Sequence, residues 1–447
     1  MSTGDSRVAI VGGGILGMTL ALRLRSAGMQ PTVIEAAPAP GGLASSDPIG
    51  TYQWDRFYHV ILKSDAELLR LLDELDLGDR LRWGFTRTAC YAGGRFHPLT
   101  TSLDFLRFPP LGLIEKARLA ATIMHASRIT DWQGLERETA SAWLTRWSGE
   151  GTYQRLWLPL LRSKLGENAE RASAAFIWAI IARMYAARRS GLKREMFGYV
   201  DGGYDLILSR FRRRLEEMGV EFACGTPVSA VRPMPGGVTV RLADGTEREF
   251  DSALLTVPCG QAGAMCPDLT PAERARLQRV VYQGIICPSL LLKQPLGGRY
   301  ITSITDEWVP FTAVIEMTAL VDRERFGGHT LVYLPRYLTQ KSPVWSRSDE
   351  DIVEESVEAL LRMYPRLRRD DVVSSRVARA RDVLALSTLN YSRDALPPLR
   401  TSIPGVYVVN GAQIAAGTLN VNETVTLADQ QAAAFLELVP RRAVAAR

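Results

Sequence analysis

The first forty residues alternate between short apolar runs and more polar stretches, the pattern of strands separated by a helix. Val8–Val11 is a run of four apolar residues and is predicted as a short buried strand. After a glycine-rich turn, Met18–Ala27 is predicted as a helix, and Pro31–Ile34 as a second strand. This order indicates an α/β unit at the start of the chain.

Similar patterns return later in the chain. Residues 220–258 read as a strand at Glu221–Ala223, a turn, a two-stranded ribbon with an Ala-Asp-Gly hairpin, and a returning strand. Near the end, a strand at Val406–Val409 leads through a glycine-rich turn to the helical run Val425–Leu438, for which Asn422 is the predicted N-cap. These segments are predicted to return to the α/β unit.

Three glycines occupy the first strand-to-helix turn. Gly12 allows the tight turn, Gly14 lets a phosphate approach the backbone, and Gly17 permits close packing of the helix, whose N-terminus favours an anion. Glu35 ends the second strand, where a carboxylate accepts hydrogen bonds from both hydroxyls of an adenosine ribose. A Rossmann-type dinucleotide site is predicted, the alternative being a tight turn without a ligand. Its predicted contacts are Gly12, Gly14, Ile15, Leu16, Gly17, Glu35 and Ala36.

Composition and charge limit the partners. The chain has 447 residues, 46% hydrophobic and 23% charged, which is enough for two large domains. The net charge is +6, but the basic residues are scattered among 48 acids, so nucleic acid is not an expected partner, while an anionic substrate or a membrane surface stays open. Five cysteines without metal spacing and an N-terminus without signal-peptide features favour a cytoplasmic protein. Nothing in the sequence indicates an oligomeric state.

The chain is not predicted to span a membrane. The two longest apolar stretches fall short of the roughly 18 uncharged residues that a span needs. Three charged residues interrupt Phe108–Ala126, and Arg183 interrupts Ala174–Ala187. Two interpretations remain for these helices, either an amphipathic core helix or a peripheral membrane contact.

A second glycine pair, Gly41 and Gly42, follows the strand that ends in Glu35. With the first motif, this pair resembles the superfamily of flavin amine oxidases, protoporphyrinogen oxidases and phytoene desaturases, although a glycine pair alone also suits an ordinary turn. The resemblance extends to DRFYHVILKSD (55–65), RWSGEGTYQRLWLPLLRSKLG (146–166), GYVDGGYDLI (198–207), VVYQGIICPSLLLKQPL (280–296) and GVYVVNGAQI (405–414). These stretches are similar to a bacterial protoporphyrinogen-oxidase-like branch.

The resemblance implies FAD as the cofactor and adds site residues. Gly41, Gly42 and Leu43 would approach the FAD diphosphate, and Val228 would meet the adenine through its backbone. The helix N-terminus at Asn422, Thr424 and Val425 would face the flavin, where its dipole stabilises charge that develops on reduction. An ordinary capped terminal helix is the alternative.

The resemblance also implies the architecture, an α/β fold with two discontinuous domains. A Rossmann-type FAD-binding domain is expected from residues 1–60, 200–280 and 395–447. A mixed α+β substrate domain is expected from residues 61–199 and 281–394.

Three departures from the family pattern change the expected contacts. Ala39 and Pro40 stand where relatives carry an arginine, and Asn410-Gly411 replaces a Gly-Asp pair. Cys287 aligns with the lysine of amine oxidases, and Lys293 lies well beyond it. The last departure argues against an amine oxidase.

The DRFYH stretch holds the predicted catalytic residues. Relatives have a glycine-rich stretch here, beside the flavin ring, and Phe57 and Tyr58 replace it. Tyr58 and His59 are therefore predicted at the reacting face, where the imidazole accepts a proton while hydride leaves for flavin N5. The alternative is that His59 only forms hydrogen bonds within the fold. The other three histidines show no metal-site spacing.

The predicted function is that of an FAD-dependent oxidoreductase, an oxidase, dehydrogenase or desaturase, that takes a hydride from a C–H bond of a small molecule. Aromatic residues suit a bulky apolar substrate, or else belong to the plain core. They are Trp143, Trp147, Trp157, Trp178, Tyr185, Tyr333 and Tyr337. The alternatives are a flavin-dependent isomerase resembling UDP-galactopyranose mutase and, more distantly, a non-catalytic flavoprotein.

Overall fold

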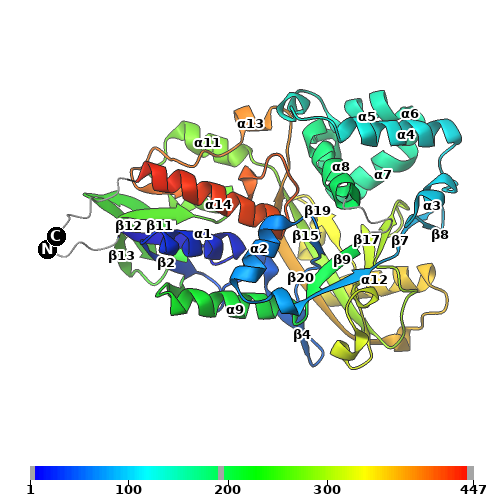
Figure 1. The fold of residues 1–447 in the computed structure, drawn as a ribbon, viewed down its shortest axis with the longest axis horizontal. Coiled ribbons are helices and arrows are strands. Elements are labelled where there is room, and N and C mark those ends of the chain that lie inside the picture. Colours follow the sequence, from blue (N-terminus) through cyan, green and yellow to red (C-terminus); the bar gives the residue numbers. More distant parts are fainter. Residues whose placement is uncertain (1–5, 190–195, 440–447) are drawn as a thin grey trace.

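A five-stranded parallel sheet forms one end of the molecule (Figure 1). The computed structural model describes residues 6–189 and 196–439. In spatial order the strands are β10 (Glu221–Cys224), β2 (Gln30–Glu35), β1 (Arg7–Val11), β14 (Ser252–Leu255) and β21 (Val406–Val408). They come from the three separate stretches predicted to form the FAD-binding domain, while the boundaries of that domain stay a prediction.

Both faces of this sheet are covered, which explains why its strands are apolar throughout. Side chains alternate along β1, so Val8 and Ile10 pack on one face and Ala9 and Val11 on the other. The first face is covered by α1 (Ile15–Ser26), α9 (Gly203–Glu217) and α14 (Val421–Leu438). The second is covered by the antiparallel sheet of β11 (Val228–Met234), β12 (Gly237–Leu242) and β13 (Glu247–Phe250), and by α10 (Cys259–Met265) and α11 (Pro271–Arg279).

Three expected elements have different limits in the structure. Helix α1 begins at Ile15 and not at Met18, because extended Gly14 serves as its N-cap directly after the turn. The predicted two-stranded ribbon is a three-stranded sheet, since β12 pairs with both β11 and β13. The terminal helix begins at Val421 and not at Val425.

The other end of the molecule contains an eight-stranded sheet. Its order is β19 (Arg336–Leu338), β15 (Tyr282–Leu292), β18 (Thr330–Tyr333), β17 (Ala313–Glu316), β16 (Ile301–Ile304), β7 (Thr88–Ala92) and β8 (Arg95–Pro98), with β20 (Val372–Ala385) paired to β15. The long β15–β20 pair contains a bulge, because Gln283 pairs with Leu384 whereas Ile285 pairs with Ala380. Three residues of β20, Arg381 to Val383, therefore face one residue of β15.

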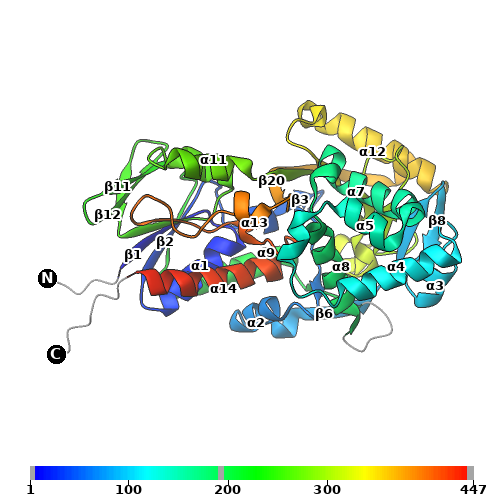
Figure 2. The same cartoon turned by 90° about the horizontal axis from the view of Figure 1, so that it is seen from above.

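Helices form a separate layer over this end (Figure 2). They are α3 (Ser102–Leu106), α4 (Leu113–Ala126), α5 (Ala140–Ser148), α6 (Glu150–Thr152), α7 (Leu158–Leu165) and α8 (Ala174–Arg189). The remaining strands and α-helices are β3 (Ser46–Ile49), β4 (Tyr52–Asp55), β5 (Ile61–Leu62), β6 (Leu81–Phe85), β9 (Met196–Val200), α2 (Ala66–Glu74), α12 (Asp349–Met363) and α13 (Tyr391–Asp394). Within residues 6–189 and 196–439, no helix is both long and apolar enough to cross a membrane.

Candidate active site

A cavity of about 490 Å³ lies between the two ends of the molecule. Its lining comes from the glycine turn after β1, the loop after β2, the DRFYH stretch, the β15–β20 pair and the start of α14. Predicted site residues that line it are Gly12, Gly14, Ile15, Leu16, Glu35, Gly41, Gly42, Leu43, Tyr58, His59 and Thr424. Gly17, Ala36, Val228, Asn422 and Val425 are not among the lining residues.

Two glycine loops meet at one end of the cavity. Gly41 N donates a hydrogen bond to Gly13 O at 2.8 Å. Gly42 has φ +58°, and a Cβ at this position would lie 3.2 Å from the Cα of Gly14. Bare backbone therefore faces the cavity from both loops, an arrangement that suits a diphosphate next to the N-terminus of α1. Gly17 has a different role, because a Cβ there would lie 2.0 Å from Gly12 O and would push α1 off the turn.

Glu35 is held rigidly at the end of β2. Its Oε2 accepts a hydrogen bond from Gly13 N at 2.6 Å, and its Oε1 accepts one from Ala37 N at 2.8 Å. A carboxylate oxygen has a second lone pair, so both oxygens can still accept ribose hydroxyls. The carboxylate lines the cavity, which fits the predicted ribose contact. Val228 begins β11 and buries its side chain in the core beside this sheet.

The start of α14 reaches the cavity, but not through the predicted cap. Asn420 is the N-cap, because its side chain accepts a hydrogen bond from Glu423 N at 3.0 Å. The prediction of Asn422 as the cap is wrong. Its Oδ1 accepts hydrogen bonds from Glu67 N and Leu68 N at 3.0 and 3.1 Å, so it caps the neighbouring helix α2. The sequence does not show that the start of α2 lies beside Asn422 and supplies the N–H groups that this side chain caps.

Val425 lies inside α14 and belongs to the core against the parallel sheet. Thr424 lines the cavity, but its hydroxyl donates to Asn420 O at 2.8 Å within the helix. Together with Asn420 and Val421, it brings the first turn of α14 to the cavity wall. The N-terminal N–H groups and the helix dipole therefore point toward a place that suits negative charge.

The structure shows where the residues that depart from the family pattern lie. Asn410 and Gly411 line the cavity, and Asn410 Nδ2 donates a hydrogen bond to Val257 O at 2.9 Å. Cys287 is fully buried, and burial raises the pKa of its thiol to about 12. Lys293 is exposed and directly follows Leu292, the last residue of β15. Neither Cys287 nor Lys293 lines the cavity, and among the described residues its lining contains no lysine.

Tyr58 and His59 line the other end of the cavity. The Tyr58 hydroxyl shares a hydrogen bond with the Tyr337 hydroxyl at 2.8 Å, and burial raises the pKa of Tyr58 well above its usual value. The His59 ring packs against Tyr204 at an interplanar angle of 43°, with 4.5 Å between ring centroids. Burial lowers the pKa of His59 to about 4. At neutral pH the imidazole is therefore neutral and able to accept a proton.

Asp55 lies behind His59 and was missed in the sequence. Its Oδ2 is 3.9 Å from His59 Nδ1, a buried atom that has no hydrogen-bond partner among the described residues. Oδ1 accepts a hydrogen bond from Tyr204 N at 2.7 Å. Burial raises the pKa of Asp55 to about 7, although Arg376 opposes this effect. The available signal was an aspartate at the end of a strand, four residues before His59 in the DRFYH stretch.

Arg183 brings a guanidinium group to the cavity lining, although in the sequence it only interrupts an apolar helix. Its Nη2 lies 3.1 Å from Asp65 Oδ1. Of the aromatic residues predicted to suit a bulky substrate, Tyr337 lines the cavity. Trp143 and Tyr333 are buried in two separate cores, and Trp157 and Trp178 pack against the core of Trp143. The aromatic content therefore belongs mainly to the core. The structure also brings Thr256, Val257 and Pro258 to the cavity; these residues follow β14, and strand ends of this kind often bind ligands.

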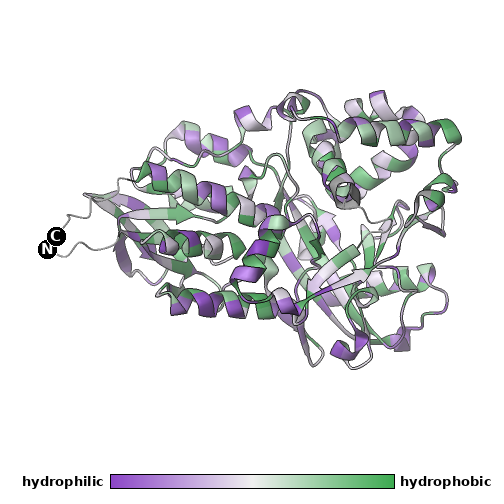
Figure 3. Cartoon of the chain, in the orientation of Figure 1, coloured by the Kyte–Doolittle hydropathy of each residue, from purple (hydrophilic) through white to green (hydrophobic). Residues whose placement is uncertain are grey.

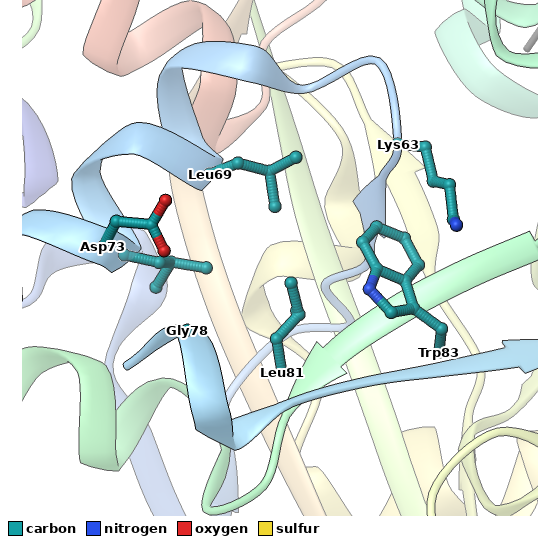
Figure 4. Close-up of a pocket in the computed structure, with 7 residues that line it drawn as sticks. Lys63, Leu69, Asp73, Gly78, Leu81 and Trp83 are labelled. Atoms are coloured by element: carbon teal, nitrogen blue, oxygen red, sulfur yellow. The ribbon is translucent and has the colours of Figure 1, made fainter. Parts of the chain in front are cut away.

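A smaller cavity of about 330 Å³ lies between α2 and β6 (Figure 4). It is lined by Lys63, Leu69, Leu72, Asp73, Gly78, Leu81 and Trp83. The Lys63 ammonium lies 5.2 Å from the centroid of the Trp83 ring. This cavity shares no residue with the large one and receives no part in the chemistry. Within the described ranges, no group of three metal-ligating side chains occurs.

A sequence profile of flavin containing amine oxidoreductases matches residues 17–412. The chain belongs to this family. The membership makes the cofactor a flavin and confirms the resemblance and the predicted fold class, a Rossmann-type α/β domain combined with a mixed α+β domain.

Relatives within and around the family carry several activities. A coproporphyrinogen III oxidase of Mycobacterium tuberculosis is 27% identical over 293 residues, which cover 61% of this chain and 63% of that enzyme. The match thus spans less than two thirds of the relative. A carotenoid phi-ring synthase of Streptomyces griseus is 25% identical over 62% of this chain and 58% of its own length.

Solved structures share the fold at low sequence identity. Reduced UDP-galactopyranose mutase has a TM-score of 0.75 at 17% identity, covering 98% of this chain and 97% of the other. Putrescine oxidase bound to putrescine has a TM-score of 0.74 at 17% identity, with coverage of 97% and 99%. These likenesses establish the fold alone.

Proposed function

We propose that this protein is an FAD-dependent oxidoreductase that removes a hydride from an activated C–H bond of a small molecule. The observation that carries the proposal is a single cavity with bare glycine backbone and Glu35 at one end, and His59 with Tyr58 at the other. This arrangement suits an extended dinucleotide whose diphosphate and flavin occupy different ends of one site.

Different residues are proposed to bind different parts of FAD. The Gly14 and Gly42 backbones hold the diphosphate beside the start of α1, and Glu35 accepts the ribose hydroxyls. The first turn of α14 offers its N–H groups to the flavin. FAD supplies the hydride acceptor.

His59 handles the proton. Its Nδ1 is enclosed beside Asp55, which leaves Nε2 to take a proton from the substrate. The ring starts neutral because its pKa is about 4. Tyr58 stays protonated and forms the wall of the cavity beside His59 through its hydrogen bond to Tyr337. This division suits general base catalysis by His59 and positioning by Tyr58.

The substrate class follows from the lining. Ile285, Val383 and Leu419 supply apolar surface, while Arg183 offers guanidinium donors beyond the Nη2 contact to Asp65. We propose a largely apolar substrate with an anionic group that pairs with Arg183. Coproporphyrinogen III is the first compound to test, because the mycobacterial relative is named for its oxidation.

The protein is proposed to work in the cytoplasm. All five cysteines are free, and four of them are buried, as suits a reducing compartment.

Anaerobic reduction of the bound flavin tests the function. Purified protein is expected to be yellow with FAD, and coproporphyrinogen III, or another compound from panels of isoprenoids and amines, is expected to bleach it without other reductants. Colourless protein that fails to bind added FAD contradicts the cofactor. Turnover of a sugar nucleotide only after chemical reduction of the flavin would instead favour an isomerase.

A further inference from the structure

Helix α4 carries large apolar residues on its exposed side as well as on its buried side. Its exposed face carries Leu113, Ile114 and Met124, which are 78%, 79% and 47% exposed. Its buried face consists of Leu119 and Ala126 together with Lys116 and Thr122. A helix that only covers a core places its apolar residues inward, so this one presents an apolar face that the described part of the chain leaves uncovered.

The neighbouring helix α3 extends this surface. Leu103 and Leu106 are 52% and 57% exposed. Lys116 Nζ donates a hydrogen bond to Leu106 O at 2.7 Å, which ties the end of α3 to α4. We name Leu103, Leu106, Leu113, Ile114 and Met124 the apolar patch. These are five of the eleven large apolar residues that are exposed in the described ranges, within a stretch of only 22 residues.

The surroundings of the apolar patch are basic. Residues 95–128 contain five Lys and Arg against two acids, a net charge of +3. Both acids are engaged in local contacts. Glu115 accepts hydrogen bonds from Gly112 N and Arg155 Nη2, and Asp104 accepts one from Thr101 N. The exposed Arg107, Arg118 and Arg128 therefore set the sign of the local field.

The patch occupies the end of the molecule opposite the parallel sheet (Figures 1 and 2), and hydrophobic colour marks the outer ends of α3 and α4 in Figure 3. We infer that α3 and the start of α4 dock onto an anionic lipid surface. Leu113 and Ile114 enter the interfacial region while the arginines contact headgroups, as in helices that lie in a membrane interface. A protein partner would not require this basic surround.

Co-sedimentation with vesicles tests the inference on the full chain, independently of any catalytic activity. The protein is expected to bind phosphatidylglycerol vesicles and to bind pure phosphatidylcholine vesicles at least about tenfold more weakly. Leu113→Ser with Ile114→Ser is expected to reduce binding to phosphatidylglycerol at least about tenfold. Val373→Ser, which removes a 45% exposed side chain from a strand outside the patch, is the matched control and is expected to bind normally.

Two results would overturn the inference. The first is failure of the unaltered protein to bind phosphatidylglycerol vesicles, or equal binding by the double variant. The second is an oligomer in solution that the double variant converts to a monomer, because the patch would then be an interface between protein chains. Circular dichroism and the melting temperature establish that each variant is folded.

Discussion

The two ends of the cavity are built on different principles. At the glycine end, backbone groups and Glu35 form short hydrogen bonds with one another, such as the 2.6 Å contact from Gly13 N. At the histidine end, Asp55 and His59 stand 3.9 Å apart, and burial disfavours the charged form of each. At the glycine end the polar groups have hydrogen-bond partners within the protein and are held in place for a ligand. The other end keeps titratable groups in unfavourable surroundings, as sites of proton transfer often do.

The sharpest way to separate the two ends is His59→Ala. We expect FAD to stay bound, while reduction of the flavin by the substrate slows by roughly 10² to 10⁴, the range for loss of a general base. Anaerobic stopped-flow absorbance measures this rate. His329→Ala is the matched control, because His329 binds Phe326 O outside the cavity. An unchanged rate and pH profile in His59→Ala would make His59 structural.

Glu35→Ala is expected to affect the opposite end. Loss of the charge-assisted hydrogen bonds should weaken FAD binding by about 1.5–3 kcal/mol. Titration of apoprotein with FAD measures the affinity. Glu221→Ala removes another strand carboxylate, one that pairs with Arg248 outside the cavity, and should leave the affinity unchanged. Equal affinities for both variants would remove Glu35 from the ribose site.

Asp55→Asn tests the unfavourable charge. Because the folded-state pKa of Asp55 is raised from 3.8 to about 7, the unfolded chain releases this proton at lower pH, and Asp55 makes the folded state less stable as pH rises from about 4 to 7. Asparagine cannot ionise and keeps the oxygen that accepts from Tyr204 N. We expect the variant to gain on the order of 2 kcal/mol relative to the unaltered protein between pH 5 and 8.

Urea unfolding of both proteins at pH 5 and at pH 8 measures this difference in the free energy of unfolding. The His59 contribution has the opposite sign, since its lowered pKa favours folding as pH rises from about 4 to 6.5. His59 is present in both proteins, so its contribution largely cancels in the comparison. A pH-independent difference between them would show that Asp55 ionises normally.

The smallest expected effect distinguishes binding from packing at α14. Asn422→Ala should lower the free energy of unfolding by about 1 kcal/mol, because α2 loses its cap, and should leave FAD affinity within about twofold. Asn420→Ala removes the cap of α14 itself, beside the cavity, and should weaken FAD as well as stability. If Asn422→Ala weakened FAD binding and Asn420→Ala did not, the predicted contact between Asn422 and FAD would be supported.

The same contrast explains what could be predicted from the sequence. The glycine end depends on consecutive elements within the first 45 residues, the unit β1–α1–β2 and the loop that follows it, so Gly14, Gly42 and Glu35 all reach the cavity. Local spacing carries that information. Strand positions also agreed within a residue or two, because short apolar runs mark buried parallel strands.

The rest depends on contacts between distant segments. Asn422 caps a helix more than 350 residues earlier in the chain. Arg183 reaches the cavity because α8 packs across it, and no local pattern shows that. The sequence left open whether the aromatic residues contact a bulky substrate or belong to the core. Trp143 and Tyr333 are buried in cores, because large apolar side chains are usually buried there.

The bulge in the β15–β20 pair has a mechanical consequence. It places Asp382 and Val383 on the cavity wall, and Tyr282 and Ile285 line the cavity on either side of the displaced pairing. A bulge interrupts the ladder of hydrogen bonds and is where a long strand pair bends most easily. Bending at the bulge would move Asp382 and Val383 relative to the glycine loops and the first turn of α14, which line the cavity from other elements, while the regular pairing on both sides of the bulge is kept.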